Sequence, residues 1–239
     1  MINQLKVEQY KMWRFLPFYL CILFSLLIFA GALIHGYTPE FLRITGYTRM
    51  SDGFIEGVQD CSYAFLWGLM VSWYVGIDFT GRTIHRAVVT GNSRWSIILS
   101  RYLSVSVLVL LFHVIVILQT ILSFGKQFGV SFEGFRPEYL LWFGVVCLQI
   151  LAFTAFFAMI SFLMANVYLA LFTAVPIALL GGNILRNFLG GNYIYEHSFF
   201  CLAKSCEISD LAPCAICAII AIVVFLVATI VIVNRKDIQ

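Results

Sequence analysis

Long apolar runs alternate with short polar segments along the whole chain. Crossing a bilayer takes about 20 consecutive apolar residues in one helix. Six stretches approach or exceed this length, namely residues 15–34, 58–79, 102–124, 139–165, 167–185 and 213–233. Asn166 alone separates the fourth and fifth, which predicts a tight helical hairpin. The pattern predicts an all-α polytopic membrane protein, with six transmembrane helices in a single domain over residues 1–239.

The second run is short, and it reaches spanning length only if the residues at its ends lie at the membrane interfaces. Composition supports the membrane class, because the chain is 62% hydrophobic and 11% charged. A soluble domain is nearer ~45–50% apolar and ~25% charged. Basic residues precede the first run, as in a secretory signal, but signals carry only ~7–15 apolar residues. We therefore interpret the first run as a retained span.

The polar segment before the first span, residues 5–14, is too polar to cross a membrane. One interpretation is an interfacial helix, with Tyr10 and Trp13 at the depth of the lipid headgroups. The other is a solvated tail with an ordinary aromatic anchor. The sequence leaves both open.

Basic residues divide unequally between the two sides of a six-span topology. The side that holds both termini, residues 78–101 and Asn166 carries nine Lys or Arg, and the other side carries six. Lys and Arg near span ends favour the cytoplasmic side. Both termini are therefore predicted to be cytoplasmic, in a multi-pass protein of the plasma membrane.

The segment between the second and third spans, residues 81–94, reads GRTIHRAVVTGNSR. Ile84, Ala87 and Val88 recur there at positions i, i+3 and i+4, which makes one apolar stripe among basic residues. This pattern predicts a short amphipathic helix over about residues 80–91, on the cytoplasmic side. Such a short helix is marginal alone, so it must rest on lipid headgroups or dock in a groove of a partner.

Capping signals stand at both ends of this helix. Thr80 or Thr83 can cap its start, and Gly91 followed by Asn92 is a stop signal. Ser93 or Ser96 then begins the next helix.

This region resembles the corresponding segment of type-two ABC exporter permeases. There, an acidic residue and a Gly-Thr-(Ile/Leu)-Lys/Arg element lead into a Gly/Pro-x-Ser-Arg turn. The matching pattern here is Asp78-Phe79-x3-Thr83-Ile84-x3-Val88-x2-Gly91-x-Ser93-Arg94-x2-Ile97-x2-Ser100-Arg101. The closing Asn234-Arg235-Lys236-Asp237-Ile238 is also similar to the usual ending of that family. One departure is Arg82, which stands where the family usually has glycine.

The resemblance implies that the short helix is a coupling helix, seated in a cleft of an ATP-binding subunit. It implies contact roles for Arg82, Thr83, Ile84, Arg86, Ala87, Val88, Gly91 and Arg94, with the apolar members forming a seat and the arginines a polar rim. The other interpretation is an ordinary cytoplasmic loop whose arginines only fix topology.

The chain lacks the motif of an ATPase. A P-loop needs Gly-x4-Gly-Lys-Ser/Thr, and Gly125-Lys126 does not fit it. We expect the spans to lack the buried Asp, Glu, Lys or Arg of a proton- or sodium-coupled carrier. The polar residues within them are His113, Gln119, Gln149 and Asn183, and we expect His113 to be hydrogen-bonded to a neighbouring helix. We predict no enzyme activity, catalytic residue, cofactor, metal or nucleic-acid partner.

The segment between the fifth and sixth spans, residues 186–212, is expected to lie outside. Two Gly-Gly-Asn sequences begin at Gly181 and Gly190, which predicts that the fifth span breaks near its outer end. The segment can then re-enter the bilayer as a short hairpin, or it can form a plain loop with two glycine turns. Cys201 and Cys206 within it can close a disulfide, whereas Cys214-Ala-Ile-Cys217 is interpreted as span packing.

These observations predict the permease subunit of an ABC exporter. It would work as a dimer with a second copy or a sibling permease, together with two ATPase subunits. Its cargo would be amphipathic or peptide-like, with an antimicrobial peptide, and hence antibiotic resistance, as the first guess. The alternatives are a non-transporting immunity or sensor protein and a secondary carrier or channel.

Overall fold

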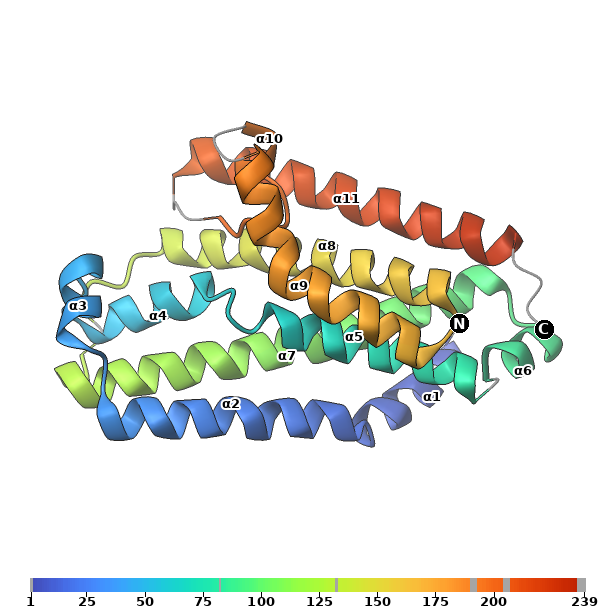
Figure 1. The fold of residues 1–239 in the computed structure, drawn as a ribbon, viewed down its shortest axis with the longest axis horizontal. Helices are drawn as coiled ribbons and strands as arrows, with labels where there is room; N and C mark the ends of the chain where they lie inside the picture. The colour runs from blue at the N-terminus through green and yellow to red at the C-terminus, as the bar shows by residue number, and fades with distance from the viewer. Residues whose placement is uncertain (1, 82, 132, 190–192, 204–206, 236–239) are drawn as a thin grey trace.

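The protein is a bundle of helices (Figure 1). The computed structural model describes residues 2–81, 83–131, 133–189, 193–203 and 207–235. Within these ranges there is no strand. The helices are α1 (Ile2–Trp13), α2 (Leu16–His35), α3 (Pro39–Thr45), α4 (Met50–Gln59), α5 (Ala64–Thr80), α6 (Thr83–Val89), α7 (Arg94–Phe128), α8 (Glu138–Met164), α9 (Val167–Leu189), α10 (Tyr193–Glu196) and α11 (Ile208–Arg235).

Five of the described helices, α2, α7, α8, α9 and α11, are long and apolar enough to cross a membrane. They correspond to five of the six predicted spans. The predicted second span is different, because α5 has 17 residues and α4 precedes it across a break. The protein is thus an all-α polytopic membrane protein, and its second apolar run lies almost entirely in α5, with only residues 58 and 59 at the end of α4.

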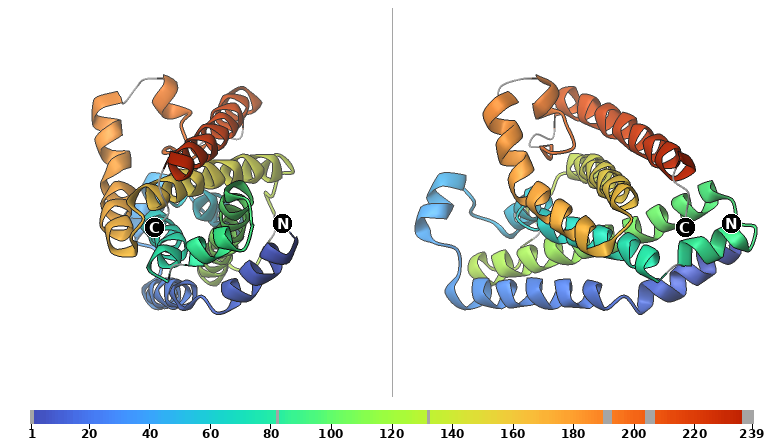
Figure 2. Two further views of the ribbon diagram at one scale, coloured as in Figure 1. Left: turned by 90° about the vertical axis from the view of Figure 1, so that its right-hand side faces the viewer. Right: turned by 45° about the vertical axis from the view of Figure 1, so that its right-hand side comes forward.

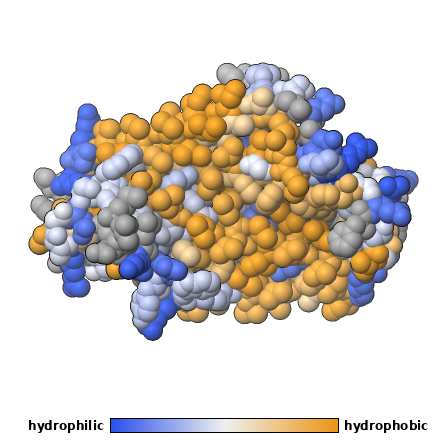
Figure 3. Space-filling view, turned by 180° about the vertical axis from the view of Figure 1, so that it is seen from behind, coloured by the Kyte–Doolittle hydropathy of each residue, from blue (hydrophilic) through white to orange (hydrophobic). Residues whose placement is uncertain are grey.

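The surface has the polarity expected for a bilayer. On the face seen in Figure 3, apolar residues form a broad band across the middle, and hydrophilic residues gather toward the two ends. The helices α1 and α6 and the C-terminal end of α11 lie at one end, here called the α6 end, and α3 lies at the other (Figure 1). The two described terminal helices therefore reach the same end of the bundle as α6.

The core lies where α5, α7 and α8 meet. Its largest fully buried side chains include Trp67, Tyr74, Phe112, Trp142 and Phe157. Around this centre, α2 and α4 pack on α7, α9 packs on α5, and α11 packs on α8. The helices α9 and α11 splay apart at the side of the bundle (Figure 2).

The predicted hairpin between α8 and α9 is confirmed. Ala165 ends α8 in the left-handed conformation, with φ of 52°. The Asn166 side chain then accepts a hydrogen bond from the Tyr168 amide at 2.8 Å, which caps the start of α9. One asparagine therefore suffices to reverse the chain.

The predicted break in the fifth span is wrong. The helix α9 runs without interruption from Val167 to Leu189, through Gly181 and Gly182. Each glycine lowers helix stability by only ~1 kcal/mol. The hydrogen-bonded helix therefore continues through Gly181 and Gly182. The second glycine pair, Gly190 and Gly191, lies outside the described residues, whereas residues 193–203 of the predicted outer segment are described and begin with α10.

Candidate functional site

The predicted amphipathic helix exists at the α6 end. It covers Thr83–Val89, slightly inside the predicted range. Gly91 follows with φ of +86°, a conformation that glycine adopts without strain. The Asn92 side chain donates to the Ala87 carbonyl at 3.0 Å, so the stop signal works as predicted.

The next helix begins at the predicted serine. Ser93 is the N-cap of α7, and its hydroxyl accepts a hydrogen bond from the Ser96 amide at 3.3 Å. Arg94 follows directly, and its guanidinium donates to the Val233 carbonyl at 2.8 Å and to the Asn234 carbonyl at 3.3 Å. These carbonyls are at the end of α11, where a cation is favourable. Arg94 therefore joins the start of α7 to the end of α11.

The apolar stripe of α6 is divided between the bundle and the surface. Ile84 is 2% exposed and belongs to a small apolar cluster with Val75, Ile98, Phe162 and Val233. This side chain anchors α6 to its own chain and presents almost no surface to a partner.

The remaining predicted contact residues are more accessible. Ala87 and Val88 are half-buried, and Arg86 is exposed. Val89, which was not among the predicted contacts, is 71% exposed. Arg82 lies outside the described residues. The surface of α6 that a partner can reach is therefore formed by Arg86, Ala87, Val88 and Val89, and we call it the α6 surface.

A cluster of buried charges lies directly beneath α6. Asp78 receives the Lys11 ammonium at 2.7 Å and the Nε of Arg101 on the same carboxylate oxygen. The Thr83 hydroxyl donates to its other oxygen at 2.8 Å. Arg101 also lies 3.7 Å from Glu8. The cluster thus connects α1, α5, α6 and α7.

Tyr74 completes this arrangement. Its hydroxyl donates to the Glu8 carboxylate at 2.7 Å, and its backbone carbonyl accepts from Lys11 at 3.1 Å. Burial lowers the pKa of Lys11, while the carboxylates of Asp78 and Glu8 act in the opposite direction. Two acids and two bases compensate one another here, which is the condition under which charges can remain buried.

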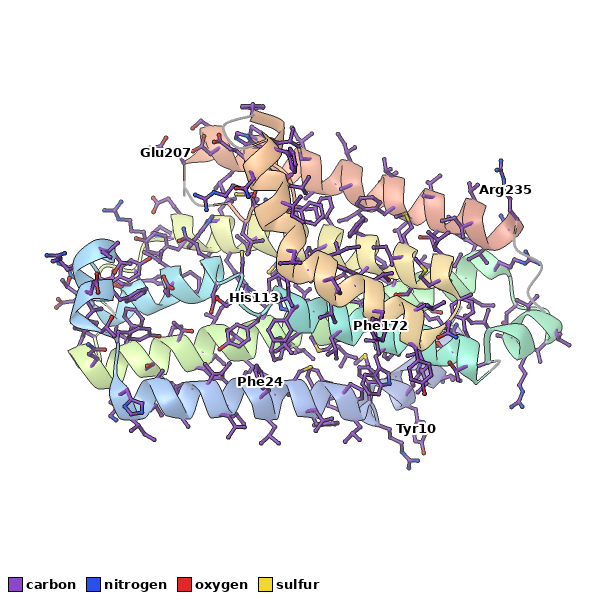
Figure 4. All side chains as sticks on the ribbon, viewed as in Figure 1. Tyr10, Phe24, His113, Phe172, Glu207 and Arg235 are labelled. Atoms are coloured by element: carbon purple, nitrogen blue, oxygen red, sulfur yellow. The ribbon has the colours of Figure 1, made fainter. Side chains whose placement is uncertain are left out.

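Two sequence-based expectations change as a result. The spans do carry buried charges, since Asp78 and Arg101 are 4% and 5% exposed within α5 and α7. A solvated N-terminal tail is also excluded, because Glu8 is 4% exposed. The helix α1 lies along the bundle with Tyr10 pointing away from it (Figure 4). The signal was present in the sequence, since Glu8 and Lys11 are one helical turn apart and therefore share a face.

A second candidate site lies in the half of the bundle away from α6. It is a cavity of about 920 Å³ between the start of α5, the last turns of α9 and the segment that follows α10. Its lining residues are Gln59, Cys61, Ala64, Trp67, Phe153, Ala178, Leu179, Gly182, Arg186, Asn187, Tyr195, Glu196, Phe199, Phe200, Cys201 and Leu202. The sequence pattern did not indicate that these residues would line one cavity.

Polar residues of α8 hold the far wall of the cavity. The Gln149 amide donates to the carbonyls of Ser198 and Cys201, at 3.2 and 3.0 Å, and accepts from the Ala203 amide at 2.9 Å. The Trp142 indole donates to the Ala203 carbonyl at 2.7 Å. Gln149 is thus a support for irregular backbone, which explains a polar residue in an apolar span.

Two buried groups beside the cavity lack a partner. The indole nitrogen of Trp67 and Nε2 of His113 make no hydrogen bond with the described residues. The two rings pack edge to face, with centroids 5.5 Å apart, and Figure 4 places His113 in the middle of the bundle. The predicted hydrogen bond of His113 to a neighbouring helix is therefore wrong for this nitrogen. A buried donor without an acceptor costs about 1–3 kcal/mol.

Cys201, Cys214 and Cys217 lie in the described part of the chain. Cys206 lies outside it, so the predicted pair with Cys201 does too. Cys214 is buried and Cys217 is half-buried on α11, and both are free thiols. No group of three or more His, Cys, Asp or Glu among the described residues could hold a metal ion.

Comparisons with protein-family models, with curated proteins and with solved structures each found no match for this chain.

Proposed function

We propose that this protein is the membrane-spanning permease subunit of an ATP-driven ABC exporter. The observation that carries the proposal is the short helix α6. It lies at the same end of the bundle as α1 and the C-terminal end of α11 (Figure 1), it begins three residues after α5, and it presents an apolar and basic surface. The sequence has no P-loop, so ATP hydrolysis takes place in a separate subunit.

The contacts of α6 suit a force-transmitting role. Thr83 joins it to Asp78 at the end of α5, and through Asp78 to Arg101 of α7. Ile84 inserts between neighbouring helices. Because packed interiors deform little, a partner that displaces α6 moves α5 and α7 with it. The buried charges add α1 to the moving unit.

The complete transporter would contain two permeases and two ATPase subunits. The helices of one chain are few to enclose a transport path, and pairing with a second copy or a sibling permease doubles their number. The apolar bundle suits an amphipathic or peptide-like cargo, such as an antimicrobial peptide taken from the bilayer. In such a transporter the protein would lie in the plasma membrane, with both termini in the cytoplasm.

A secondary carrier is the second candidate, and the buried charges are the observation that favours it. Ionisable residues inside a membrane protein commonly mark an ion pathway. Here, however, Asp78 and Glu8 are each paired with a base, and the cluster lies next to α6. A clamp between helices accounts for these contacts without a moving proton.

The proposal is tested by isolating the tagged protein from its native cells and identifying its partners by peptide sequencing. A subunit with a P-loop should accompany the wild type. Val89→Asp, which places a charge on the α6 surface, should reduce its recovery at least tenfold. Val130→Asp is the matched control, because Val130 is 80% exposed near the other end of α7.

Ile84 is unsuitable for this test, since a charge at a buried position would unfold the end of the bundle. Size-exclusion profiles should be the same for wild type, Val89→Asp and Val130→Asp. The exporter proposal fails if no P-loop protein accompanies the wild type. It also fails if recovery is unchanged by Val89→Asp in a folded protein.

A further inference from the structure

The helix α1 turns its paired charges inward and aromatic rings outward. Glu8 and Lys11 face the bundle and form salt bridges there. On the opposite side, Val7, Tyr10 and Trp13 are each more than half exposed, and Tyr10 points away from the bundle (Figure 4). An amphipathic helix keeps its apolar residues away from water. The outward side of α1 therefore has a neighbour other than water alone.

The chain places this side of α1 at the edge of the membrane. The helix α2 begins at Leu16, three residues after the end of α1, and it is long and apolar enough to span a bilayer. The Tyr19 hydroxyl of α2 donates to the Trp13 carbonyl at 2.9 Å, and the side chains of Leu16 and Tyr19 are exposed. The outward side of α1 thus continues into the exposed, lipid-facing side of α2, at the level where Trp and Tyr are enriched in membrane proteins.

Two cations are held on the same side of α1. Lys6 is exposed and precedes Tyr10 by one helical turn. Arg14 is also exposed, and its guanidinium lies over the Tyr10 ring, 4.4 Å from the centroid. Neither cation forms a salt bridge with a described residue. We call Lys6, Val7, Tyr10, Trp13 and Arg14 the α1 outer face.

No acid of the N-terminal part of the chain offsets these two cations. Glu8 is the only Asp or Glu in residues 1–39, and its side chain is buried against Arg101 and Tyr74. The α1 outer face therefore combines positive charge, two aromatic rings and an aliphatic side chain. Anionic phospholipids have the complementary pattern, with negative phosphates directly above apolar chains.

The inner contacts of α1 fix this face in position. Lys11 donates to Asp78 at 2.7 Å and to the Tyr74 carbonyl at 3.1 Å, and the ring of Phe15 packs edge to face on Tyr74. A binding surface that is already ordered loses less conformational entropy when its ligand arrives. The charge cluster beneath α6 thus also supports α1 from behind.

We propose that the α1 outer face binds anionic phospholipids of the adjacent leaflet. The headgroup phosphates contact Lys6 and Arg14, the rings of Tyr10 and Trp13 lie among the headgroups, and Val7 lies toward the acyl chains. Each basic residue near an anionic lipid surface strengthens binding about fivefold. This binding requires no ATPase, so the inference is independent of the exporter proposal.

The test uses the purified full-length protein in detergent micelles, with bound lipids counted by native mass spectrometry. Wild type should bind phosphatidylglycerol more tightly than phosphatidylcholine with the same acyl chains. Combining Lys6→Gln with Arg14→Gln should weaken phosphatidylglycerol binding about 25-fold, fivefold for each cation, and leave phosphatidylcholine binding unchanged. Arg43→Gln combined with Arg136→Gln is the matched control, because both are exposed cations outside α1, and it should have no effect.

A second measurement locates the lipid. The protein is placed in phosphatidylcholine nanodiscs with a trace of phosphatidylglycerol that carries a diazirine beside its headgroup. Illumination should label peptides that contain residues 6–14. Excess unlabelled phosphatidylglycerol should abolish this labelling, whereas excess glycerol phosphate, which lacks acyl chains, should not.

Equal phosphatidylglycerol binding by wild type and the Lys6→Gln, Arg14→Gln protein would overturn the proposal. An equal loss in the control protein would do the same, because total charge would then explain the preference. Labelling confined to other peptides, or competition by glycerol phosphate, would also contradict it. The changed side chains are all exposed, so thermal unfolding should match wild type, and the two single variants replace any pair that unfolds earlier.

Discussion

At the scale of single residues, Arg101 shows how this protein keeps charges inside a membrane bundle. One guanidinium serves the carboxylates of Asp78 and Glu8, which come from different helices. Removing one partner of a buried ion pair leaves an uncompensated charge and costs about 3–5 kcal/mol. Arg101 therefore links α7 to α1 and α5. It also belongs to the sequence pattern that resembles the exporter permeases.

We expect Arg101→Met to lower the free energy of unfolding by about 3–5 kcal/mol, because Asp78 and Glu8 would lose their shared counter-charge. Denaturant unfolding in mixed micelles, followed by circular dichroism, measures this. Arg86→Met on the exposed side of α6 is the control, with an expected change within ~0.5 kcal/mol. Equal stability of the two variants would show that the cluster contributes little.

At the scale of elements, α4 illustrates packing through glycine. Gly53 and Gly57 are one turn apart and face α7, where a Cβ at Gly53 would come within 2.9 Å of Phe124. Such close approach is the usual way in which membrane helices associate, because lipid gives no hydrophobic driving force between them. The helix α4 therefore adheres to α7 and carries the break that borders the cavity.

Gly57→Ala should destabilise the protein by about 1–3 kcal/mol through overpacking, although alanine favours helix by ~1 kcal/mol. Gly144→Ala in α8 is the matched control, since a Cβ there meets nothing within 4 Å. Thermal unfolding midpoints should therefore rank Gly144→Ala at or above wild type, and Gly57→Ala below it. The reverse order would mean that α4 does not pack tightly on α7.

At the scale of the whole molecule, the two polar ends differ in charge and in content. The α6 end holds α1, the C-terminal end of α11 (Figure 1) and the buried clamp, while the cavity lies in the opposite half. If the basic residues set orientation, α6 faces the cytoplasm and α3 faces outside. This orientation is a prediction on which the exporter proposal depends.

Impermeant thiol labelling of intact cells tests this orientation. Val130→Cys, at an 80% exposed position, should react from outside, whereas Val89→Cys, at a 71% exposed position, should react only after the membrane is permeabilised. Wild-type labelling provides the baseline, because Cys61 is itself exposed. Reaction of Val89→Cys in intact cells would place α6 on the outside and exclude contact with a cytoplasmic ATPase.

The sequence alone determined the membrane class, the approximate positions of the long helices and the ends of α6. These features depend on local properties, namely the length of apolar runs and the capping preferences of glycine, asparagine and serine. The turn at Asn166 was predictable for the same reason. The break expected at Gly181 was not found, because packing outweighed a weak local preference.

Only the tertiary structure decided what the polar residues inside the bundle do. Asp78 and Arg101 are 23 positions apart, and Asp78 and Lys11 are 67 apart. No periodicity relates groups at such separations, so their pairing depends on how the helices pack. The cavity arises in the same way, where a break in one span meets a segment held by Gln149 of another. Hydrophobicity selects the membrane, whereas partners for buried polar groups are found only when distant helices meet.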